Sequence, residues 1–358
     1  MSDLARIAGC SVNTISLALR DSPRISPATR ERIHDLAREH GYRINPMVSA
    51  LISSRRKTVP TQTIGILTKF ARPFDEPAYQ PQFYVELMRG IRAKAAALGF
   101  SLAEFPCAQA GAPDAKRLTQ ILLARGIRGV LLFPSGEVET PYPSLEWKHF
   151  AVLAAGFHAR NWPVHRTALD QGRAMEICLH QLTARGIRRI GFGMTRALDA
   201  RWGYAASGRF LSWQACVPPR DRIPLVPGDA EIPQEIEFKA WVLEHRPEAV
   251  IIYYDFYVKQ LEEIEGEHGI KVIPVTINSS DLPEVAGVTP RVAQLGATSI
   301  GVLARELYLN HYGIPAEPEI TLVGSDWHDG TRLGPIPPGQ HGSGVDDTLS
   351  PMQDITFP

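Results

Sequence analysis

The chain has few cysteines and no long apolar run. Cys10, Cys107, Cys178 and Cys216 are scattered over 358 residues without the spacing of a metal site or a disulfide framework. Reduced thiols are therefore expected. No apolar run approaches the roughly eighteen residues that a membrane helix needs, and the N-terminus lacks the basic start and apolar core of a signal peptide. Together these absences predict a cytoplasmic protein.

Recognisable catalytic motifs are absent as well. The sequence contains no Walker loop, no G-x-S-x-G and no H-E-x-x-H, and Gly191-Phe192-Gly193 lacks the third glycine of a dinucleotide-binding loop. Residues 325–329 hold three potential metal ligands, but they begin a Gly- and Pro-rich stretch without an apolar period. We therefore expect no enzymatic activity, no cofactor and no metal.

The chain has no net charge, but its positive and negative residues are unevenly distributed along the sequence. The first 57 residues hold ten Lys/Arg and five Asp/Glu, a net charge of +5, whereas the remainder carries −5. A basic segment on an acidic body favours a polyanionic partner for that segment alone. A chance fluctuation on a solvated helical face would give the same count.

Residues 3–19 have the pattern of a helix-turn-helix. Apolar residues recur at helical spacing on both sides of Gly9-Cys10-Ser11, where the pattern breaks. Gly9 tolerates the positive φ of a tight turn, and Ser11 is a favourable N-cap for the second helix. Ile15 and Leu19 are expected to face inward. An ordinary helical hairpin is the alternative interpretation.

A third helix is predicted from Ser26-Pro27 to about Gly41, followed by a short apolar helix after Asn45-Pro46. The short helix is too brief to be stable alone. Two copies packed together could insert side chains into a DNA minor groove. The alternative is a linker helix that packs on its own body.

Residues 3–51 resemble the headpiece and hinge of the LacI/GalR (lactose-repressor/galactose-repressor) family of bacterial transcriptional regulators. The residues that carry the resemblance are Asp3-Leu4-Ala5, Ala8-Gly9, Ser11, Thr14-Ile15-Ser16, Leu19, Ser22-Pro23, Ser26, Thr29-Arg30, Gly41-Tyr42-Arg43, Asn45-Pro46 and Leu51. The family implies a recognition helix at about 12–19 in the major groove and a hinge helix at about 46–53 that folds on the operator. Its DNA contacts correspond here to Ser11, Val12, Asn13, Thr14, Ser16, Leu17, Arg24, Asn45 and the wedge residue Leu51.

Three residues depart from the family pattern. Leu17 stands where the family usually has Arg, which replaces a bidentate base donor by an apolar group suited to a thymine methyl. Val12 is also apolar where a polar or aromatic residue is common, so Asn13 becomes the best base-edge donor. Ile44 replaces the usual hinge proline.

From residue 63 onward, apolar strands alternate with helices, a pattern typical of parallel sheets wrapped by helices. Strands are predicted at 63–67, 101–105, 129–133, 150–155, 166–169, 188–193, 249–253 and 272–275. Helices are predicted at 83–100, 114–125, 171–185, 201–214, 232–244, 257–265 and 291–312. The similarity of 123–130 to 183–190 indicates two related lobes, and the family resemblance, weaker here, extends to about residue 323.

The expected fold is therefore a small all-α helix-turn-helix headpiece plus a two-lobed, periplasmic-binding-protein-like α/β body. We assign 1–44 to the headpiece, 45–60 to hinge and linker, 61–323 to the effector-binding and dimerisation domain, and 324–358 to a Gly/Pro-rich tail.

The cleft between the lobes is the expected ligand site, because open α/β sheets bind ligands beyond the carboxyl ends of their strands. By the resemblance, Arg201 reaches the effector, although Gly203 comes one residue early for the family's R-x-x-G. Asp255 and Asp170 match family acids, and Phe83 can stack on a sugar ring. The alternatives are a surface Arg for Arg201, an N-cap for Asp170 and a core residue for Phe83.

The sequence thus predicts a homodimeric, sequence-specific transcriptional regulator, of which repression is the commoner family mode. Its partners are a double-stranded DNA operator, at which it is nucleoid-associated, and a small, carbohydrate-like effector. The alternative is a bilobed solute-binding or sugar-processing protein without operator binding; the missing signal peptide and the +5 segment weigh against it.

Overall fold

The structure is a computed structural model that describes residues 2–18, 25–39, 62–70, 82–107, 112–134, 142–157, 162–227, 235–278, 284–331 and 333–336. We call the part before residue 40 the headpiece and the part from residue 62 the body, and describe each by itself. The predicted hinge helix at 46–53 lies outside the described residues, as do Arg24, Asn45 and Leu51.

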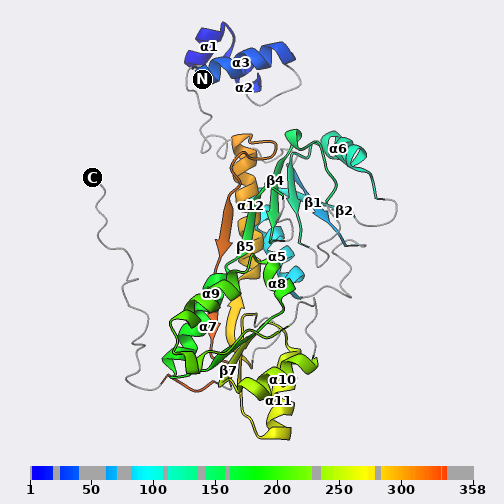
Figure 1. Cartoon of the computed structure of the whole chain (residues 1–358). Helices are drawn as coiled ribbons and strands as arrows, with labels where there is room; N and C mark the ends of the chain where they lie inside the picture. The colour runs from blue at the N-terminus through cyan, green and yellow to red at the C-terminus, as the bar shows by residue number, and fades with distance from the viewer. Residues whose placement is uncertain are drawn as a thin grey trace, which may run out of the picture. The chain divides into compact units, whose positions relative to one another are not determined.

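The headpiece consists of three helices, α1 Ser2–Ala8, α2 Val12–Ala18 and α3 Pro27–Glu39 (Figure 1). They share a core made of Leu4, Ala5, Ala8, Ile15, Ala18, Ile33 and Ala37. Gly9 has φ +65° in the turn, where only glycine avoids strain, and the N–H of Thr14 donates to the Ser11 hydroxyl at 3.1 Å. The predicted helix-turn-helix and its inward-facing Ile15 are confirmed.

The first lobe of the body is built on six parallel strands in the order β10-β5-β4-β3-β1-β2. These strands are β1 Thr63–Thr68, β2 Ser101–Pro106, β3 Gly129–Leu132, β4 Ala151–Ala155, β5 His165–Leu169 and β10 Ile320–Val323. Its helices are α5 Gln82–Leu98, α6 Ala115–Ala124 and α12 Val292–Leu309, with a 3-10 turn, η2, at Trp147–His149. Leu67, Val130 and Leu132 pack with α6 on one face of the sheet, which is why the central strands are apolar throughout.

The second lobe has five strands in the order β11-β9-β8-β7-β6, and β11 alone runs antiparallel to its neighbour. They are β6 Ile190–Gly193, β7 Ala249–Ile252, β8 Ile273–Thr276, β9 Ala286–Pro290 and β11 Ser325–His328. The helices are α7 Gln171–Ala184, α8 Arg196–Arg201, α9 Ala205–Ala215, α10 Glu235–His245 and α11 Phe256–His268, with a 3-10 turn, η3, at Pro219–Asp221.

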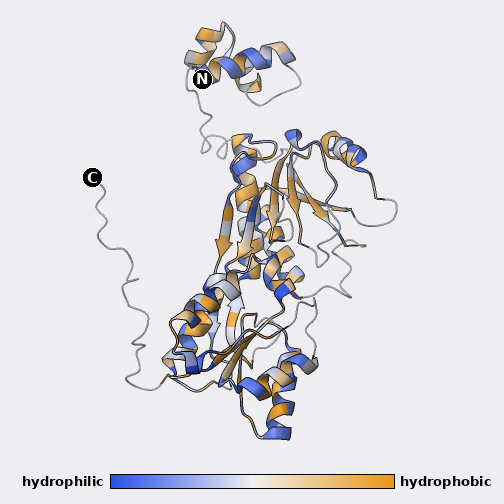
Figure 2. Ribbon diagram, in the orientation of Figure 1, coloured by the Kyte–Doolittle hydropathy of each residue, from blue (hydrophilic) through white to orange (hydrophobic). Residues whose placement is uncertain are grey.

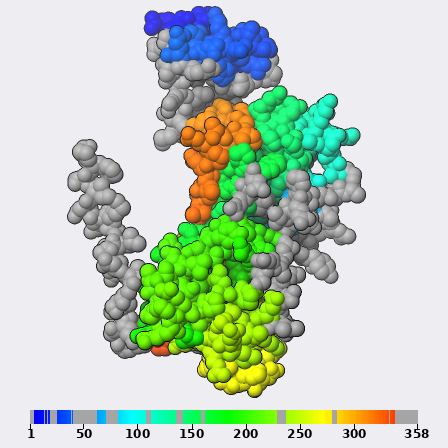
Figure 3. All heavy atoms as spheres, in the orientation of Figure 1, coloured from blue at the N-terminus to red at the C-terminus, as the bar shows by residue number. Residues whose placement is uncertain are grey.

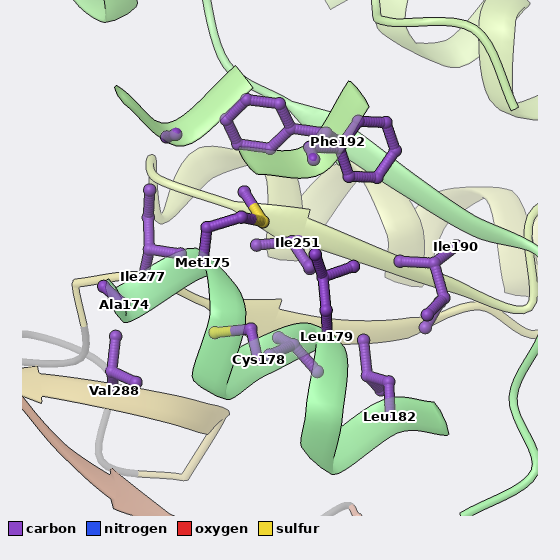
Figure 4. Close-up of a cluster of buried hydrophobic side chains, with 14 of the residues drawn as sticks. Ala174, Met175, Cys178, Leu179, Leu182, Ile190, Phe192, Ile251, Ile277 and Val288 are labelled. Atoms are coloured by element: carbon purple, nitrogen blue, oxygen red, sulfur yellow. The ribbon is translucent and has the colours of Figure 1, made fainter. Parts of the chain in front are cut away.

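Apolar contacts hold each layer of the second lobe to the next. Met175, Cys178 and Leu179 of α7 lie against Ile251 and Val288 of the sheet (Figure 4). On the other side, α10 and α11 pack on β7 and form the outer end of this lobe in the space-filling view (Figure 3). Both helices carry hydrophobic and hydrophilic residues, as Figure 2 shows, which is the pattern of helices with one buried face.

Among the described elements, the chain crosses between the lobes three times, after β5, after β9 and after β10. Two interactions join these crossings. The N–H of Asp170 donates to the carbonyl of Val323 at 2.9 Å, and Arg291 Nε donates to an Asp326 carboxylate oxygen at 2.7 Å. The two-lobed α/β body expected from the sequence is confirmed. These crossings and the two interactions between them connect the lobes.

Two predicted helices differ from the structure. The helix predicted at 201–214 is instead two helices, α8 and α9, separated by a turn in which Gly203 and Tyr204 have φ of +69° and +61°. Left-handed residues cannot continue an α-helix, so the chain turns there. The long helix predicted at 291–312 ends at Leu309, because Asn310 has φ +55°.

Part of the predicted tail belongs to the body. β9, β10 and β11 were not predicted, and β11 lies within the segment assigned to the tail. Trp327 packs on the core of the second lobe, and Arg185 holds the next residues by donating to Asp329 at 2.6 Å and to the Gly334 carbonyl at 2.7 Å. β11 was missed because four mixed residues are too few to show a period of two.

No helix among the described residues is long and apolar enough to span a membrane.

Candidate functional site

The predicted DNA contacts lie on the headpiece, and the predicted effector contacts lie on the body. On the headpiece, α2 presents its first turn to solvent. Ser11 and Val12 are exposed, Val12 to 45%, while Thr14 and Leu17 are half-buried. The Ser11 and Thr14 hydroxyls lie 2.8 Å apart, so the pair both caps the helix and keeps polar oxygens at its outer end. The side chains of Asn13 and Ser16 lie outside the description.

The exposed side chains of α2 are of the types that contact DNA in a groove. An exposed valine beside hydroxyl groups can contact thymine methyls and phosphate or base-edge acceptors. Ile15 on the opposite face is fully buried, so it anchors the helix to α1 and α3. The guanidinium of Arg32 on α3 donates to the Ala8 carbonyl at 3.0 Å, which ties α3 to the end of α1. The packing of α2 against α1 and α3 therefore fixes the position of its exposed face.

On the body, aromatic rings gather at the carboxyl edge of the first sheet. The ring of Tyr84, near the start of α5, lies 5.1 Å from Phe70, which follows β1, and 6.0 Å from Phe133, which follows β3. Phe83 contacts the Tyr84 ring at 5.4 Å and is half-buried. Phe83 is therefore part of this aromatic group, as a core residue of a helix start would be, and its predicted contact with a ligand stays a prediction.

Polar groups lie on both sides of these rings. Thr68 at the end of β1 is buried, and the next residue, Lys69, places its ammonium 4.8 Å from the ring centre of Tyr142. The Tyr142 hydroxyl donates to the Phe133 carbonyl. Burial raises the pKa of Tyr142 far above its ordinary value and that of Cys107 to about 11, so both stay protonated near neutral pH.

On the second lobe, Arg201 is presented by the corner between α8 and α9. Thr195 caps α8 by accepting the Leu198 N–H at 3.3 Å. Asp199 is buried, and its carboxylate accepts the N–H of Ser207 at 3.5 Å, which connects α8 to the first turn of α9. Trp202 packs its ring 5.1 Å from Tyr253. Burial raises the pKa of Asp199 above its ordinary value, and the hydrogen bonds from Ser207 and Ala206 oppose that rise.

Arg201 has an electrostatic effect on Tyr84 of the first lobe. Burial raises the pKa of Tyr84, and the positive charge of Arg201 opposes this rise. The charge of Arg201, on the second lobe, therefore acts on the Tyr84 hydroxyl of the first. The predicted contact of Arg201 with an effector stays a prediction.

The two predicted acids have different surroundings. Asp170 is the N-cap of α7 and accepts the N–H of Arg173 at 2.8 Å, which is the alternative role considered for it. Asp255 precedes α11, is exposed, and makes no capping hydrogen bond with its side chain. Their predicted effector contacts stay predictions.

Sequence reasoning missed Thr68, Lys69, Tyr84 and Tyr142. The first two directly follow a correctly predicted strand, and a strand end is the usual ligand edge, so that position was the available signal. Tyr84 adjoins the predicted Phe83. Tyr142 lies in an irregular segment outside any strand or helix, and no local pattern identifies it.

The two carboxylates among the candidate metal ligands at 325–329 have structural partners. Asp326 pairs with Arg291, and Asp329 accepts hydrogen bonds from Arg185 and, at 2.9 Å, from the Trp327 indole. These carboxylates therefore fasten β11 to the body.

Comparison with known proteins agrees with this arrangement. Residues 1–45 match the family of bacterial regulatory proteins, lacI family. The HTH-type transcriptional regulator RegA of Clostridium saccharobutylicum is 37% identical over 90 residues, which cover 25% of this chain and 23% of RegA. Catabolite control protein A of Priestia megaterium is 24% identical over 324 residues, 86% of this chain and 92% of that protein.

The lac repressor dimer bound to operator and the anti-inducer ONPF is a structural neighbour, with a TM-score of 0.51 and 18% identity, covering 93% of this chain and 98% of that chain. At this identity the likeness shows the fold alone. The match to RegA spans about a quarter of the length of that relative. The first 45 residues of this chain therefore match the lacI family of bacterial regulatory proteins, and the chain as a whole shares the fold of the solved lac repressor.

Proposed function

We propose that the protein is a sequence-specific DNA-binding transcriptional regulator, a repressor, whose affinity for its operator is set by a small molecule bound between the lobes of the body. The observation that carries the proposal is the headpiece. Its recognition helix α2 is anchored by the buried Ile15 and leaves Ser11 and Val12 exposed, within a segment that matches the lacI family. Recognition helices of this type read base edges in the major groove.

The effector site of this proposal is the carboxyl edge of the first sheet around Tyr84, together with Arg201 of the second lobe, whose charge acts on Tyr84. A ligand held by groups of both lobes changes how the lobes pack, and a ligand that binds one packing more tightly shifts the equilibrium toward it. Phe83, Asp170 and Asp255 are the further contacts we propose, with a carbohydrate-like effector. The solved regulator CelR was determined as a complex with cellobiose, at a TM-score of 0.50 and 16% identity, which supports this ligand class.

We propose that the regulator acts as a homodimer, with two headpieces on a roughly palindromic operator and a hinge segment near residues 46–53 that wedges Leu51 into the central base step. A twofold protein matches a twofold site. Such a protein acts in the cytoplasm and lies on the nucleoid when bound to its operator.

The test is selection of binding sites from random duplex DNA by the full-length protein, followed by gel-shift titration. We expect enrichment of a sequence with twofold symmetry. Val12→Glu, which places a negative charge on α2, should abolish binding to this sequence. The matched control is Leu211→Glu on α9, a residue exposed to 46%, which should bind as the natural protein does. Failure to enrich any sequence, or equal binding by both variants, would refute the proposal.

A further inference from the structure

A buried hydroxyl without a partner lies at the carboxyl edge of the first sheet. Thr68 is 1% exposed, and its hydroxyl oxygen has no hydrogen-bond partner among the described residues. Buried polar groups are nearly always paired, so an exception calls for a cause such as a missing ligand. Thr68 is also the last residue of β1, the position from which open α/β sheets contact ligands.

Strand geometry fixes the face of the sheet on which the Thr68 side chain lies. Side chains alternate along a strand, so Thr68 shares its face with Ile66, whereas Leu67 packs toward α6. Leu67 pairs with Leu132 of β3, and the ladder continues because the Phe133 N–H donates to the Leu67 carbonyl at 2.9 Å. Thr68 is therefore the cross-strand neighbour of Phe133, whose ring contacts Tyr84. The Thr68 side chain therefore lies on the face of the sheet where Phe133 contacts Tyr84, near the start of α5.

The start of α5 attracts negative charge. α5 has 17 residues, and the first N–H groups of a helix have no partner within it and carry partial positive charge. Its first turn holds no acidic residue that would neutralise them. Helix N-termini of this kind bind phosphate and carboxylate groups. Tyr84 lies in this first turn, and the positive charge of Arg201 from the other lobe lowers the pKa of its hydroxyl group against the effect of burial.

Two kinds of donor lie at this edge, the Thr68 hydroxyl from β1 and backbone N–H groups at the start of α5, and the positive charge of Arg201 on α8 acts on the same edge. Each can donate to the same oxygen atoms, and hydrogen bonds to an ionised acceptor are stronger than those to a neutral one. A neutral sugar hydroxyl would leave most of this donor capacity unused.

We propose that the ligand of this edge carries an anionic oxygen group, a carboxylate or a phosphate, which binds between Thr68, the N-terminus of α5 and Arg201. This rests on the proposed function only in calling the ligand an effector. It narrows a carbohydrate-like effector to a sugar acid or a sugar phosphate.

Inorganic phosphate and acetate are the probes, because each isolates one anionic chemistry. They are titrated into the full-length protein labelled with ¹³C-tyrosine, with sodium chloride at matched ionic strength as the control, and the Tyr84 signal is assigned with Tyr84→Phe. We expect the Tyr84 signal to move and saturate with at least one probe and not with chloride; the stronger probe identifies the anion. Equal, unsaturated movement with all three salts, or none, would overturn the proposal.

Calorimetry then compares D-gluconate and D-glucose 6-phosphate with neutral D-glucose. We expect the sugar with the favoured anion to bind at least roughly tenfold more tightly than glucose, as added hydrogen bonds to a charged group imply. Equal affinity of glucose and both charged sugars would refute the anionic assignment.

Thr68→Val tests the hydroxyl itself, since valine keeps the shape. We expect it to weaken binding of the favoured probe about tenfold, while the melting temperature stays the same or rises because an unpaired buried hydroxyl is removed. Thr68→Ser should retain binding. The matched control is Thr183→Val on α7, whose hydroxyl already donates to the Leu179 carbonyl at 2.8 Å and lies outside this edge. Undiminished binding by Thr68→Val, or a lower melting temperature, would contradict the inference.

Gel shifts on the same samples separate this inference from the proposed function. If the protein binds its selected DNA but no anion, only the anionic site fails. If it binds the anion but no DNA sequence, the regulator function fails and the site stands.

Discussion

At the scale of single residues, Asp170 shows how one carboxylate can satisfy a helix. It accepts the Arg173 N–H at 2.8 Å, and loss of such a cap destabilises proteins by about 1 kcal/mol. We therefore expect Asp170→Ala to lower the free energy of unfolding by about 1 kcal/mol, measured by urea denaturation. Asp255→Ala is the control, because the exposed Asp255 makes no capping bond and its loss should leave stability unchanged. Equal stability of both variants would show that the cap contributes nothing.

Asp199 gives a prediction about pH. Burial raises its pKa in the folded protein above the value in the unfolded chain. The folded state therefore binds this proton more tightly, so the ionised carboxyl weakens folding at neutral pH and that cost disappears as pH falls through the folded pKa. We expect the unfolding free energy of the natural protein to rise relative to Asp199→Asn as the pH falls from neutral through the raised pKa of Asp199.

Urea denaturation at each pH measures that difference. Asparagine keeps an acceptor for the Ser207 N–H but does not titrate, so it isolates the ionisation. A difference that falls toward acid would mean that the pKa of Asp199 is lowered, contrary to its burial.

At the scale of elements, α5 and α12 approach each other through glycine. A Cβ atom at Gly90 would overlap the Ala293 carbonyl, and one at Gly296 would overlap the Leu87 carbonyl. Backbone atoms cannot move aside as side chains do. We expect Gly90→Ala and Gly296→Ala each to lower the free energy of unfolding by about 1–3 kcal/mol or more, as overpacking does.

The matched control for these glycines is Gly208→Ala in α9. Gly208 is exposed, and a Cβ there would meet nothing within 4 Å. Because alanine is the better helix former, we expect Gly208→Ala to raise stability by about 0.5–1 kcal/mol. Thermal denaturation of the three variants would contradict the close helix contact if all three behaved alike.

The same scale shows what sequence alone can predict. The central strands were predicted because they are apolar runs of four to six residues bounded by turns, and the helix-turn-helix because Gly9 and Ser11 mark its turn. The break between α8 and α9 was not predicted, because it depends on a left-handed Tyr204 and on Asp199 reaching across the corner, neither of which leaves a periodic pattern.

Only some residues of the candidate site could be predicted from the sequence. Arg201 was identified by resemblance and Phe83 by its position after the first strand; Phe83 contacts Tyr84, and the charge of Arg201 acts on Tyr84. Thr68 was not, since its importance arises from an unpaired hydroxyl that only the arrangement of β1, β3 and α5 reveals. Contacts between distant segments are the part of a site that local patterns cannot show.

At the scale of the whole body, Arg291 and Asp326 join two of the three crossings between the lobes. Arg291 holds the pKa of Asp326 below its ordinary value, so the pair stabilises the folded protein above the unfolded pKa and loses that effect as pH falls through the lower folded value. We expect Arg291→Gln to raise the pKa of Asp326 toward normal, measured by carboxyl ¹³C NMR.

The same variant should melt at a lower temperature than the natural protein near neutral pH and low salt. The difference should shrink in high salt and in acid, because exposed ion pairs are screened. A melting difference that is independent of both salt and pH would assign the effect to packing instead.

The placement of β11 also limits how this protein can be shortened. Composition alone suggests trimming the chain where it turns rich in glycine and proline, at residue 324. Such a product would end before the strand that completes the second sheet, and would remove Asp329 and Gly334, which accept hydrogen bonds from the buried Arg185 side chain. A deletion series for crystallisation or reporter fusion should accordingly stop no earlier than residue 336.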